Sequence, residues 1–566
     1  MKLSYDLVAC VLTCLLIDHV LDFVNWHAGN QHEHAGAHPR HIPDELSSSV
    51  WCRGPSHVAR TCTFKNLYYR GDTGDFVFLH GAGTTLVGDL NGRNDPALTD
   101  LSSVSDHGAF YFKFVDLPES AISQHPIVVV HTETLVMSRF NPDNLMHVLH
   151  DDLIPIFSTV RELRSCSSSE EIQNCLNNLT LFLTDKRQKG PYWQLYRTLV
   201  KNQRILRRGE MSEWYRFKRA IVGLRKDSTW YQYGFTVPQG PLYAHTKTAG
   251  SEVQTFVKFF LHALNVPVTL QANRRALIIS RTKNRLITNI DELVHMVQEH
   301  TDLEPLVVDL EGAPLHSVVM MLRETRLLVG MHGSALILLM FLQPGSAVLE
   351  MFPYGINPDN YTPYKTLAHL PEINVAYAAW RNTDKQKAVF HPEYEPQFGG
   401  IHHLPLETQE QILQVDEVSP HLCCENPNWL FHIYQDTAVD ASVVPLLNKL
   451  TAHHIPGESN SLQPNMFPGP VVDLKCEIRH LFNESKQLAV SWVQPWNLVY
   501  IGFKQCQYEV WLQSGAGVEK IETDSTVLVK NTTESAFYLW VKAVCNGHSG
   551  SFNAVPPSCE STNSQY

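Results

Sequence analysis

Three polar residues in one short stretch of the chain could move a proton. Asn144, His147 and Asp151 are spaced by three and four positions, so an α-helix would carry them on one face. A carboxylate and an imidazole placed in this way can serve as a general base, with Asp151 taking the proton and His147 orienting it or taking its place. A solvated helix face would produce the same spacing, and the spacing alone does not decide between the two.

A second group of polar residues could bind a diphosphate. Arg281 and Arg285 follow one predicted strand, and the segment Met331-His332-Gly333-Ser334 joins another strand to a helix. Guanidinium charge, the free N–H groups of a helix N-terminus and the close approach that glycine permits are what a diphosphate needs. Glu350 ends a further strand, where its carboxylate could hold ribose hydroxyls. Each residue alone could be an ordinary surface charge, but together they predict a nucleotide site.

The elements that would position this second group alternate between strand and helix. Apolar strands that alternate with helices predict a parallel sheet covered on both faces. Ligands of such sheets bind beyond the carboxyl ends of the strands, which is where the arginines and the glycine fall. The predicted strands are Ala276–Ser280, Leu306–Val308, Leu327–Gly330 and Ala347–Met351. The predicted helices begin at Asn289 or cover Leu315–Arg323 and Gly333–Phe341.

The first half of the chain, residues 50–265, has a less regular pattern. Phe76–Leu79 and Ile127–Val130 are strand candidates. Asn141-Pro142-Asp143 predicts the start of a helix, with Asn141 as N-cap and Pro142 at the first helical position. We interpret this half as a second α/β domain, and two such domains facing one cleft would place a donor and an acceptor between them.

The C-terminal part is set off by a stretch rich in Pro, Gly and Ser. Residues 453–467 are therefore predicted to be a linker. From 468 to 560, short strands such as Leu488–Trp492 and Phe537–Val544 recur at regular spacing. This pattern predicts an all-β sandwich.

The N-terminal residues predict entry into the secretory pathway. Residues 1–26 are long enough to cross a bilayer, although they include three aspartates, and a single-pass anchor is favoured over a cleaved signal peptide. Lys2 would lie on the cytosolic side. Residues 27–49 are polar and rich in histidine, and a solvated stem is favoured over a metal site.

Composition and cysteine content narrow the choice of partners and compartment. The 45 Lys and Arg against 57 Asp and Glu give a net charge of −12. The sequence has no block rich in Lys and Arg, which argues against nucleic acid as a partner. Twelve cysteines without a Cys-x-x-Cys pair fit scattered disulfides in an oxidising compartment. Cys52 and Cys62 are an expected pair, and the other pairings stay open. Glycosylation sequons occur at Asn178, Asn483 and Asn531.

Three familiar catalytic motifs are incomplete. The segment 81–86 lacks the third glycine of a dinucleotide fingerprint, and 332–336 lacks the closing glycine of a nucleophile elbow. No Asp-x-Asp triplet occurs, which disfavours glycosyl transfer through a bound cation. No metal or other cofactor is therefore expected.

These segments together resemble glycosyltransferase family 61. The resemblance rests on Asn144-x-x-His147-x-x-x-Asp151 before Pro155, Ser280-Arg281-x-x-x-Arg285, Met331-His332-Gly333-Ser334 and the segment from Pro344 to Glu350. Longer stretches, 140–148, 229–235, 361–368 and 421–424, resemble the members of that family that act on O-linked mannose. The C-terminal sandwich resembles a fibronectin type III domain, with Ser491-Trp492 in its second strand and Tyr538-x-Trp540 in its sixth.

The resemblance implies a fold and an activity. The fold would be a GT-B-like pair of Rossmann-type domains, 50–265 on the acceptor side and 266–452 on the nucleotide-sugar side, followed by the fibronectin type III domain at 468–560. The activity would be transfer of GlcNAc from UDP-GlcNAc, with inversion, in β1,4 linkage to O-linked mannose on proteins such as α-dystroglycan. The enzyme would be a single-pass type II protein of the endoplasmic reticulum membrane. Whether the chain is a monomer or a homodimer stays open.

The resemblance also implies residue roles. Asp151 and His147 would be catalytic, and no metal would take part. The residues expected to bind substrate are Arg139, Asn144, Arg281, Arg285, His332, Gly333, Ser334 and Glu350.

Two other functions stay open. Within the same family, the chain could transfer GlcNAc to EGF domains. In a different class, it could be a lectin or adhesion module without catalysis, as the sandwich and the sequons alone would allow. Turnover of UDP-GlcNAc separates the enzymes from the binding module.

Overall fold

The computed structural model describes residues 46–560 with short gaps. The gaps are residues 55, 57–58, 88–97, 105, 109, 123–124, 201–204, 269–273, 421, 453–465, 481–485, 504–505, 516 and 554–555. Residues 47–566 form one compact unit. The predicted anchor 1–26, nearly all of the stem 27–49 and most of the linker 453–467 lie outside the described residues.

The prediction of a single-pass membrane protein of the endoplasmic reticulum is corrected here. Across the described residues, no helix combines the length and the apolar character that crossing a bilayer requires. That prediction was drawn from residues 1–26, which the structure does not describe.

The first half of the chain is built around one ten-stranded sheet. Its strands are β1 (Ser49–Arg53), β2 (Thr61–Arg70), β3 (Asp75–His80), β4 (Leu86–Val87), β7 (Phe114–Pro118), β8 (Ile127–Val130), β9 (Glu133–Met137), β10 (Leu179–Leu183), β11 (Ile205–Arg207) and β12 (Trp214–Val222). The main path runs β11-β10-β9-β12-β2-β1-β4. β12 is parallel to β8 and β9 but antiparallel to β2. This half is α/β as predicted, but its sheet is mixed, because consecutive strands joined by short turns, such as β2 and β3, pair antiparallel.

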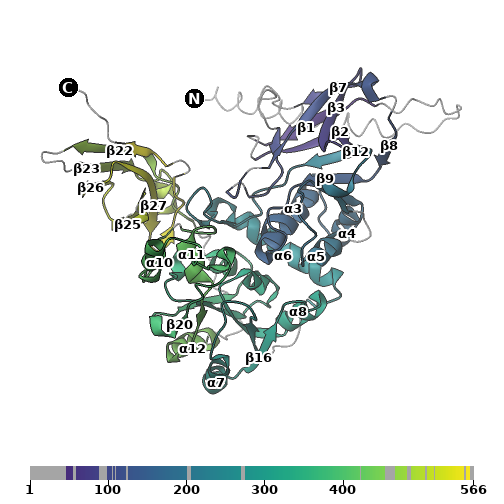
Figure 1. The fold of residues 1–566 in the computed structure, drawn as a ribbon. Coiled ribbons are helices and arrows are strands. Elements are labelled where there is room, and N and C mark those ends of the chain that lie inside the picture. The colour runs from purple at the N-terminus through teal and green to yellow at the C-terminus, as the bar shows by residue number, and fades with distance from the viewer. Residues whose placement is uncertain are drawn as a thin grey trace, which may run out of the picture. The chain divides into compact units, whose positions relative to one another are not determined.

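Helices of the first half gather on one side of this sheet (Figure 1). They are α2 (Leu145–His147), the π-helical turn η3 (Val148–Leu153), α3 (Ile154–Leu163), α4 (Ser169–Asn177), α5 (Trp193–Leu199) and α6 (Thr246–Ala263). The predicted helix start at Asn141 is wrong by three residues. Asn141 accepts the N–H of Asp143 in a local turn, and Asn144 is the N-cap, accepting the N–H of Met146.

The second half contains the predicted parallel sheet. Its strands are β15 (Arg275–Ser280), β16 (Glu304–Asp309), β17 (Thr325–Met331), β18 (Ala347–Phe352) and β19 (Ala376–Arg381). All four pairings in the order β16-β15-β17-β18-β19 are parallel. Helices of this half are α7 (Ile290–His300), α8 (Leu315–Arg323), η6 (Ser334–Phe341), α9 (Pro363–Ala368), α10 (Leu406–Leu413), α11 (Pro427–Ile433) and α12 (Val444–Ala452). α7 and α12 pack together on one face, and η6 packs against α8 and α9.

One hydrophobic core runs through both halves. It joins Leu135 and Met137 of β9 with Leu277 and Ile279 of β15, and it includes almost all of η6. η6 therefore packs against α6 and α2 of the first half as well as against its own sheet. The two halves share this apolar packing, and each also buries a cluster of its own, around Phe64 and Phe217 in the first half and around Ile278 and Leu349 in the second.

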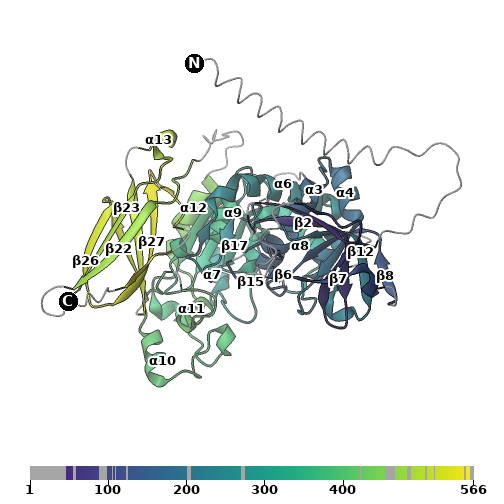
Figure 2. The ribbon, with the colours of Figure 1, turned by 90° about the horizontal axis from the view of Figure 1, so that it is seen from above.

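The C-terminal part consists mainly of β-strands in two sheets, as predicted, with one short helix, α13 (Leu498–Ile501), between β23 and β24 (Figure 2). One sheet has the order β22 (Val472–His480), β23 (Lys486–Val493) and β26 (Val527–Thr532). The other has the order β25 (Gly517–Thr523), β24 (Gln507–Ser514), β27 (Ala536–Cys545) and β28 (His548–Ser549), with β29 (Ser558–Glu560) paired to β27. Trp492, Val490 and Leu539 lie in the core of this part.

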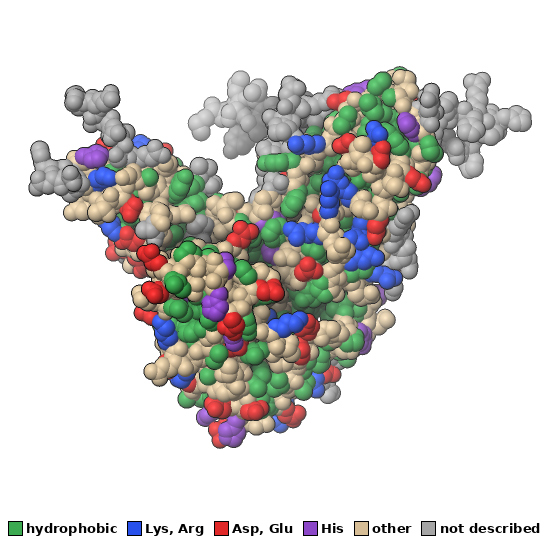
Figure 3. Space-filling view, viewed as in Figure 1, with side chains coloured by type: hydrophobic (Ala, Val, Ile, Leu, Met, Phe, Trp, Pro, Cys, Tyr) green, Lys and Arg blue, Asp and Glu red, His purple; other side chains and the backbone are tan. Residues whose placement is uncertain are grey.

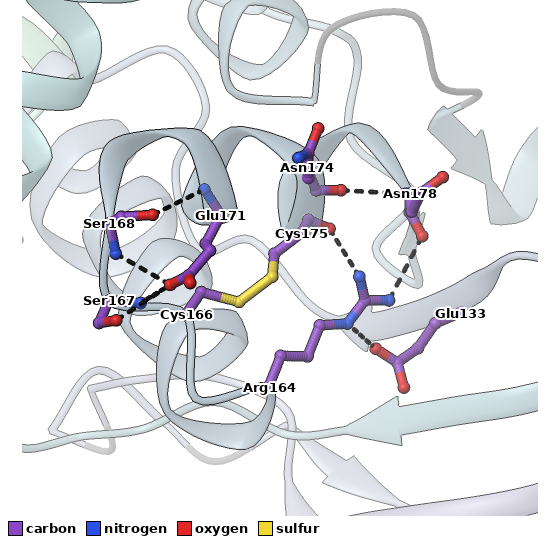
Figure 4. The surroundings of a disulfide bond; sticks show 9 residues. All are labelled: Glu133, Arg164, Cys166, Ser167, Ser168, Glu171, Asn174, Cys175 and Asn178. Carbon is purple, nitrogen blue, oxygen red and sulfur yellow. Dashed lines mark hydrogen bonds and ion pairs between the residues drawn. A yellow bond between two sulfur atoms is a disulfide. The ribbon is translucent and has the colours of Figure 1, made fainter.

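Ten cysteines form five disulfides among the described residues. Cys52 is bonded to Cys62, as the sequence predicts, and the two residues are directly paired across β1 and β2. Cys166 and Cys175 bond across the turn between α3 and α4 (Figure 4). The remaining pairs are Cys423–Cys424, Cys476–Cys559 and Cys506–Cys545.

Two of the three predicted sequons fall on exposed asparagines. Asn178 ends α4 beside the Cys166–Cys175 disulfide, as Figure 4 shows. Asn531 lies on β26. Asn483 lies outside the described residues. Glycosylation of all three stays a prediction.

Candidate active site

Asp151 lies in a turn that is wider than an α-helical one. η3 follows α2 directly and continues into α3, so a π-helical turn interrupts the predicted α-helix. Such turns are rare and occur often at functional sites. The turn places His147 and His150 against opposite oxygens of the same carboxylate.

Four side chains surround the carboxylate of Asp151, which is 3% exposed. Nδ1 of His147 lies 2.6 Å from Oδ2, and Nε2 of His107 lies 3.2 Å from the same oxygen. Nδ1 of His150 lies 2.5 Å from Oδ1, and the hydroxyl of Tyr233 donates to Oδ1 at 2.7 Å. Both oxygens therefore already have two hydrogen-bond partners each.

The backbone fixes the tautomer of His150. Its Nε2 accepts the N–H groups of Trp230 at 3.0 Å and Tyr231 at 3.3 Å, so the ring proton must be on Nδ1. That proton is donated to Asp151. Burial lowers the pKa of His150 although the Asp151 charge opposes the change, so the ring stays neutral.

Asp151 is held in its ionised form. Burial disfavours its charge, but the charge interaction with His147 and the hydrogen bonds from His107, His147 and His150 outweigh burial and hold the pKa of Asp151 well below its usual range. The same carboxylate raises the pKa of Tyr233, an effect to which burial contributes most. Tyr233 therefore remains a hydrogen-bond donor to Asp151.

Arg281 and Arg285 converge on the turn that follows β17. A Cβ atom at Gly333 would lie 3.1 Å from Nη1 of Arg285 and 3.4 Å from Nη1 of Arg281. Nη1 of Arg285 also donates to the carbonyl oxygen of His332 at 2.7 Å. Ser334 is the first residue of η6. These residues therefore meet at one edge of the parallel sheet, as the sequence predicts.

Neither arginine has a carboxylate partner among the described residues. Arg281 donates to the backbone and side-chain oxygens of Asn284, and Arg285 lies over the ring of Tyr434, with 4.7 Å between its Cζ and the ring centroid. Burial, followed by the charge of Arg285, lowers the pKa of Arg281 to about 10. Burial lowers the pKa of Arg285 as well. Two partly buried guanidinium groups that lack a carboxylate partner in the described part of the chain are suited to binding an anion.

Several other basic side chains in the described part of the chain are paired with carboxylates. Figure 3 shows Lys and Arg side chains gathered on one face over the first-half helices. Several arginines of that half have carboxylate partners, such as Arg161 with Glu252 and Arg225 with Asp227. The Arg281–Arg285 pair differs from them in lacking such a partner within the described part of the chain.

Glu350 is buried inside β18 and does not lie at its end. Its side chain is 0% exposed, its Oε1 lies 2.6 Å from Nδ1 of His332, and its Oε2 accepts the hydroxyl of Tyr377 at 2.5 Å. The predicted contact with ribose hydroxyls is therefore corrected. The carboxylate holds the His332 ring, whose side chain is 12% exposed, against the turn before Gly333.

Arg139 is also corrected. Its side chain is 0% exposed, and it donates to both oxygens of Asp185 and to the carbonyls of residues 187, 188 and 189. It braces the turn after β10, and its burial and five hydrogen bonds leave no exposed donor for a substrate in this structure. The side-chain oxygen of Asn144 caps α2, and a substrate role for this residue stays a prediction.

The elements that carry the two groups of residues pack against each other. α2, which ends at His147, packs against η6, which begins at Ser334. The ring of Tyr364 lies beside the second group, with its centroid 5.6 Å from that of His332. Burial raises the pKa of Tyr364 beyond the ordinary range, with Glu350 adding to the rise and Arg285 opposing it.

A groove lies beside the His147–Asp151 group. Its cavity volume is about 990 Å³, and it is lined by Asp106, by the loop 236–239, by α9 residues and by sandwich residues including Lys520 and Phe552. The loop joins two short antiparallel strands, β13 (Tyr231–Gln232) and β14 (Gly240–Pro241). Tyr233 begins the same loop, so one segment contacts both Asp151 and the groove.

The donor atoms of His107, His147 and Asp151 could in principle hold a metal ion, because they lie within 4.8 Å of one another. The hydrogen bonds already described account for their closeness. We therefore keep the prediction that no metal takes part.

Sequence patterns did not identify His107, His150 or Tyr233. His107 is 44 residues from Asp151 and Tyr233 is 82 residues away, so no local spacing links them. His150 does not share the spacing of three and four that singled out His147. The stretch 229–235, noted only for its resemblance to a family, was the one available signal for Tyr233.

Comparison with known proteins identifies the family of the chain. A family model described as Glycosyltransferase 61 matches residues 110–349. The protein O-linked-mannose beta-1,4-N-acetylglucosaminyltransferase 2 of Bos taurus is 40% identical over 479 residues, which cover 83% of this chain and 81% of that protein. The protein of the same name from Homo sapiens is 38% identical over 516 residues, covering 89% of this chain and 87% of that protein.

Among solved structures, rat CD45 extracellular domains d3–d4 match 16% of this chain at 18% identity with a TM-score of 0.14, which is too low to inform the fold. The identity and coverage of the two transferases, together with the family match, are sufficient to assign the chain to a family. The chain belongs to glycosyltransferase family 61 and is a glycosyltransferase.

Proposed function

We propose that this chain transfers GlcNAc from UDP-GlcNAc in β1,4 linkage to O-linked mannose on proteins, with inversion at the transferred sugar. The observation that carries the proposal is the pair of guanidinium groups beside Gly333 without a carboxylate partner among the described residues, in a chain that also holds the His147–Asp151 pair on an element packed against η6. An inverting transfer needs both a group to hold the departing diphosphate and a base for the acceptor hydroxyl. The relatives named above carry this activity in their names.

The diphosphate of the donor would lie against Arg281, Arg285 and the backbone at Gly333. Both arginines are partly buried, which reduces the screening of their charges by water, so each charge acts more strongly on an anion. As the bond to GlcNAc breaks, negative charge grows on the leaving diphosphate, and fixed positive charge stabilises that state. This role takes the place of a metal ion.

His147 is the better candidate for the base. Asp151 is ionised, but both of its oxygens are occupied by partners, which leaves little room for an acceptor hydroxyl. If Nδ1 of His147 donates to Asp151, Nε2 is free to take the proton of the mannose 4-hydroxyl. Asp151 would then orient His147 and stabilise the charge that it gains.

The groove beside this pair is proposed to hold the polypeptide that carries the mannose. Its walls come from the catalytic part and from the sandwich, and both contribute lysines, such as Lys365 and Lys520. Acceptors would include proteins such as α-dystroglycan. The order of strands in the two C-terminal sheets supports a fibronectin type III domain, and the pairing of the two α/β halves supports a GT-B-like enzyme.

The function is tested by incubating the protein with UDP-GlcNAc and an O-mannosyl peptide, with and without EDTA. We expect a β1,4-linked GlcNAc product at the same rate in both reactions. Transfer to folded EGF repeats but not to the peptide would favour the other family activity. No turnover of UDP-GlcNAc would favour a binding module, and loss of activity with EDTA would contradict transfer without a metal.

The role of the sandwich is tested in the full-length chain. Replacing Lys520, the sandwich lysine of the groove, by Ala should raise KM for an O-mannosyl peptide and leave transfer to a free mannoside unchanged. Lys530→Ala, which removes a lysine paired with Glu519 on the sandwich, is the control. Equal effects on peptide and free mannoside would make the sandwich a spacer.

A further inference from the structure

A buried carboxylate next to the candidate active site is neutralised only by hydrogen bonds. Asp106 is 7% exposed and has no ion-pair partner among the described residues. Its Oδ2 accepts the N–H groups of Tyr233, Gly234 and Phe235 at 2.8, 2.7 and 3.2 Å. Its Oδ1 accepts the N–H groups of residues 236 and 237 at 3.0 and 3.3 Å, and the Thr236 hydroxyl at 3.0 Å.

These six bonds fix the conformation of the hairpin loop between β13 and β14. Five consecutive N–H groups point at one carboxylate, so the backbone from Tyr233 onward cannot rotate without losing several charge-assisted hydrogen bonds. The outer side of the loop is closed by the Cys423–Cys424 disulfide, whose nearer sulfur lies 3.1 Å from the carbonyl oxygen of Tyr233. Tyr233 is therefore held from both sides.

The fixed loop places Tyr233 against the catalytic group. Its hydroxyl donates to Oδ1 of Asp151 at 2.7 Å, and its ring centroid lies 4.6 Å from that of His147. The residue after Asp106 is His107, which contacts Oδ2 of Asp151 at 3.2 Å. Two consecutive residues thus act on the two oxygens of Asp151. His107 contacts Oδ2 directly, and Asp106 acts on Oδ1 through the loop and Tyr233.

We infer that Asp106 is a positioning residue for the transfer, acting through the loop 233–237 and the Tyr233 hydroxyl on the Asp151–His147 pair. Asp106 does not touch the reacting atoms in this role. The inference rests on the proposed function, since it assumes that the Asp151–His147 pair activates the acceptor. It extends that function by making the orientation of the pair depend on a carboxylate that also lines the groove.

The first test is the kinetics of Asp106→Asn and Tyr233→Phe with UDP-GlcNAc and an O-mannosyl peptide. The amide that replaces the carboxylate would keep one acceptor oxygen, so half of the loop bonds would be lost. Because misplacement of a catalytic group by about 1 Å can cost about 100-fold in rate, we expect kcat to fall about 10- to 100-fold in each variant. Binding of UDP-GlcNAc, measured by calorimetry, should stay unchanged.

Non-additivity distinguishes positioning from general destabilisation. Asp106 and Tyr233 act through the same contact, so the double variant should be no slower than the slower single variant. Thr236→Val removes only one bond to Asp106 and should cause a smaller loss of kcat, which keeps the test usable if Asp106→Asn does not fold. Asp384→Asn is the control, because Asp384 caps Gln386 in an exposed turn away from the site.

Three results would overturn the inference. They are an unchanged kcat in Asp106→Asn, multiplied losses in the double variant, and a crystal structure of Asp106→Asn in which Tyr233 still donates to Asp151 at 2.7 Å. The crystal structure of Asp106→Asn shows whether Asp106 positions Tyr233, and it does so without an activity assay. If the wild-type protein transfers no GlcNAc, the proposed function fails, while a displaced Tyr233 in the variant would still support the role of Asp106.

Discussion

Arg285 donates from Nη1 to the carbonyl oxygen of His332 at 2.7 Å, directly before the glycine that both site arginines approach. This bond ties the end of β15 to the end of β17. It leaves Nη2 and the neighbouring Arg281 for an anion. The contact explains why residue 333 has no side chain.

Gly333→Ala should weaken donor binding without unfolding the protein. The new Cβ would lie 3.1 Å from Nη1 of Arg285, which is tighter than ordinary contact, while the extended backbone at this position, with φ of 164°, accepts any residue. We expect the Kd for UDP to rise and the melting temperature to stay the same. Gly209→Ala, where a Cβ meets no atom within 4 Å, is the control. Wild-type affinity in Gly333→Ala would exclude the diphosphate from this turn.

Removing either arginine should reduce UDP affinity. A hydrogen bond to a charged group contributes about 1.5–3 kcal/mol, so Arg281→Ala and Arg285→Ala should each raise Kd about 10- to 150-fold in calorimetry. Arg479→Ala, which removes an exposed arginine paired with Glu477, should leave Kd unchanged. Melting curves show whether a variant has lost fold instead of affinity. Equal binding in all three variants would refute the anion site.

His147→Ala and Asp151→Asn should both abolish transfer while keeping UDP binding. In the proposed mechanism His147 supplies Nε2 for the acceptor proton, and Asp151, 2.6 Å from Nδ1, fixes the ring. Loss of the orienting charge leaves the imidazole less basic and free to rotate. Initial rates with O-mannosyl peptide and calorimetry with UDP measure the two effects. Full activity of Asp151→Asn would end the role of the pair.

Glu171 should stabilise α4 in a manner that depends on pH. Hydrogen bonds from the N–H groups of Ser168 and Ser167 lower the pKa of Glu171 to about 2 in the folded protein (Figure 4). The unfolded value is about 4.3, so this stabilisation is complete above that pH and is lost as the pH falls towards about 2.

The measurement compares urea unfolding of the wild type and Glu171→Gln. The difference in unfolding free energy should shrink between about pH 5 and about pH 3, because protonation removes the charge from the capping box. Glu170→Gln leaves the capping box intact and is the control. If the difference in unfolding free energy grew as the pH fell, the predicted direction of the Glu171 effect would be wrong.

The sequence was most informative about the second half of the chain. Apolar strands and amphipathic helices there predicted β15, β17 and β18 closely, and Leu315–Arg323 is a helix with the predicted bounds. Arg281 and Gly333 meet because neighbouring parallel strands end at the same edge. Such local patterns are sufficient to predict a strand wherever it is buried on both faces.

Partners that are distant in the chain could not be predicted in this way. Arg139 and Glu350 have side chains typical of ligand binding, but burial gives them Asp185 and His332 as partners. Conversely, nothing near His107 in the sequence indicates that it reaches Asp151. The mixed first-half sheet escaped prediction for the same reason, since its order depends on pairings such as β2 with β12.

The hydrophobic core that runs through both α/β halves limits how the enzyme can exchange its nucleotide. Swinging the halves apart about a hinge would expose leucines and phenylalanines of η6 and α6 to water, at roughly 25 cal/mol for each Å² uncovered. Product release should therefore proceed through small rearrangements of loops and side chains at the rim, and the two halves should melt together in a single transition.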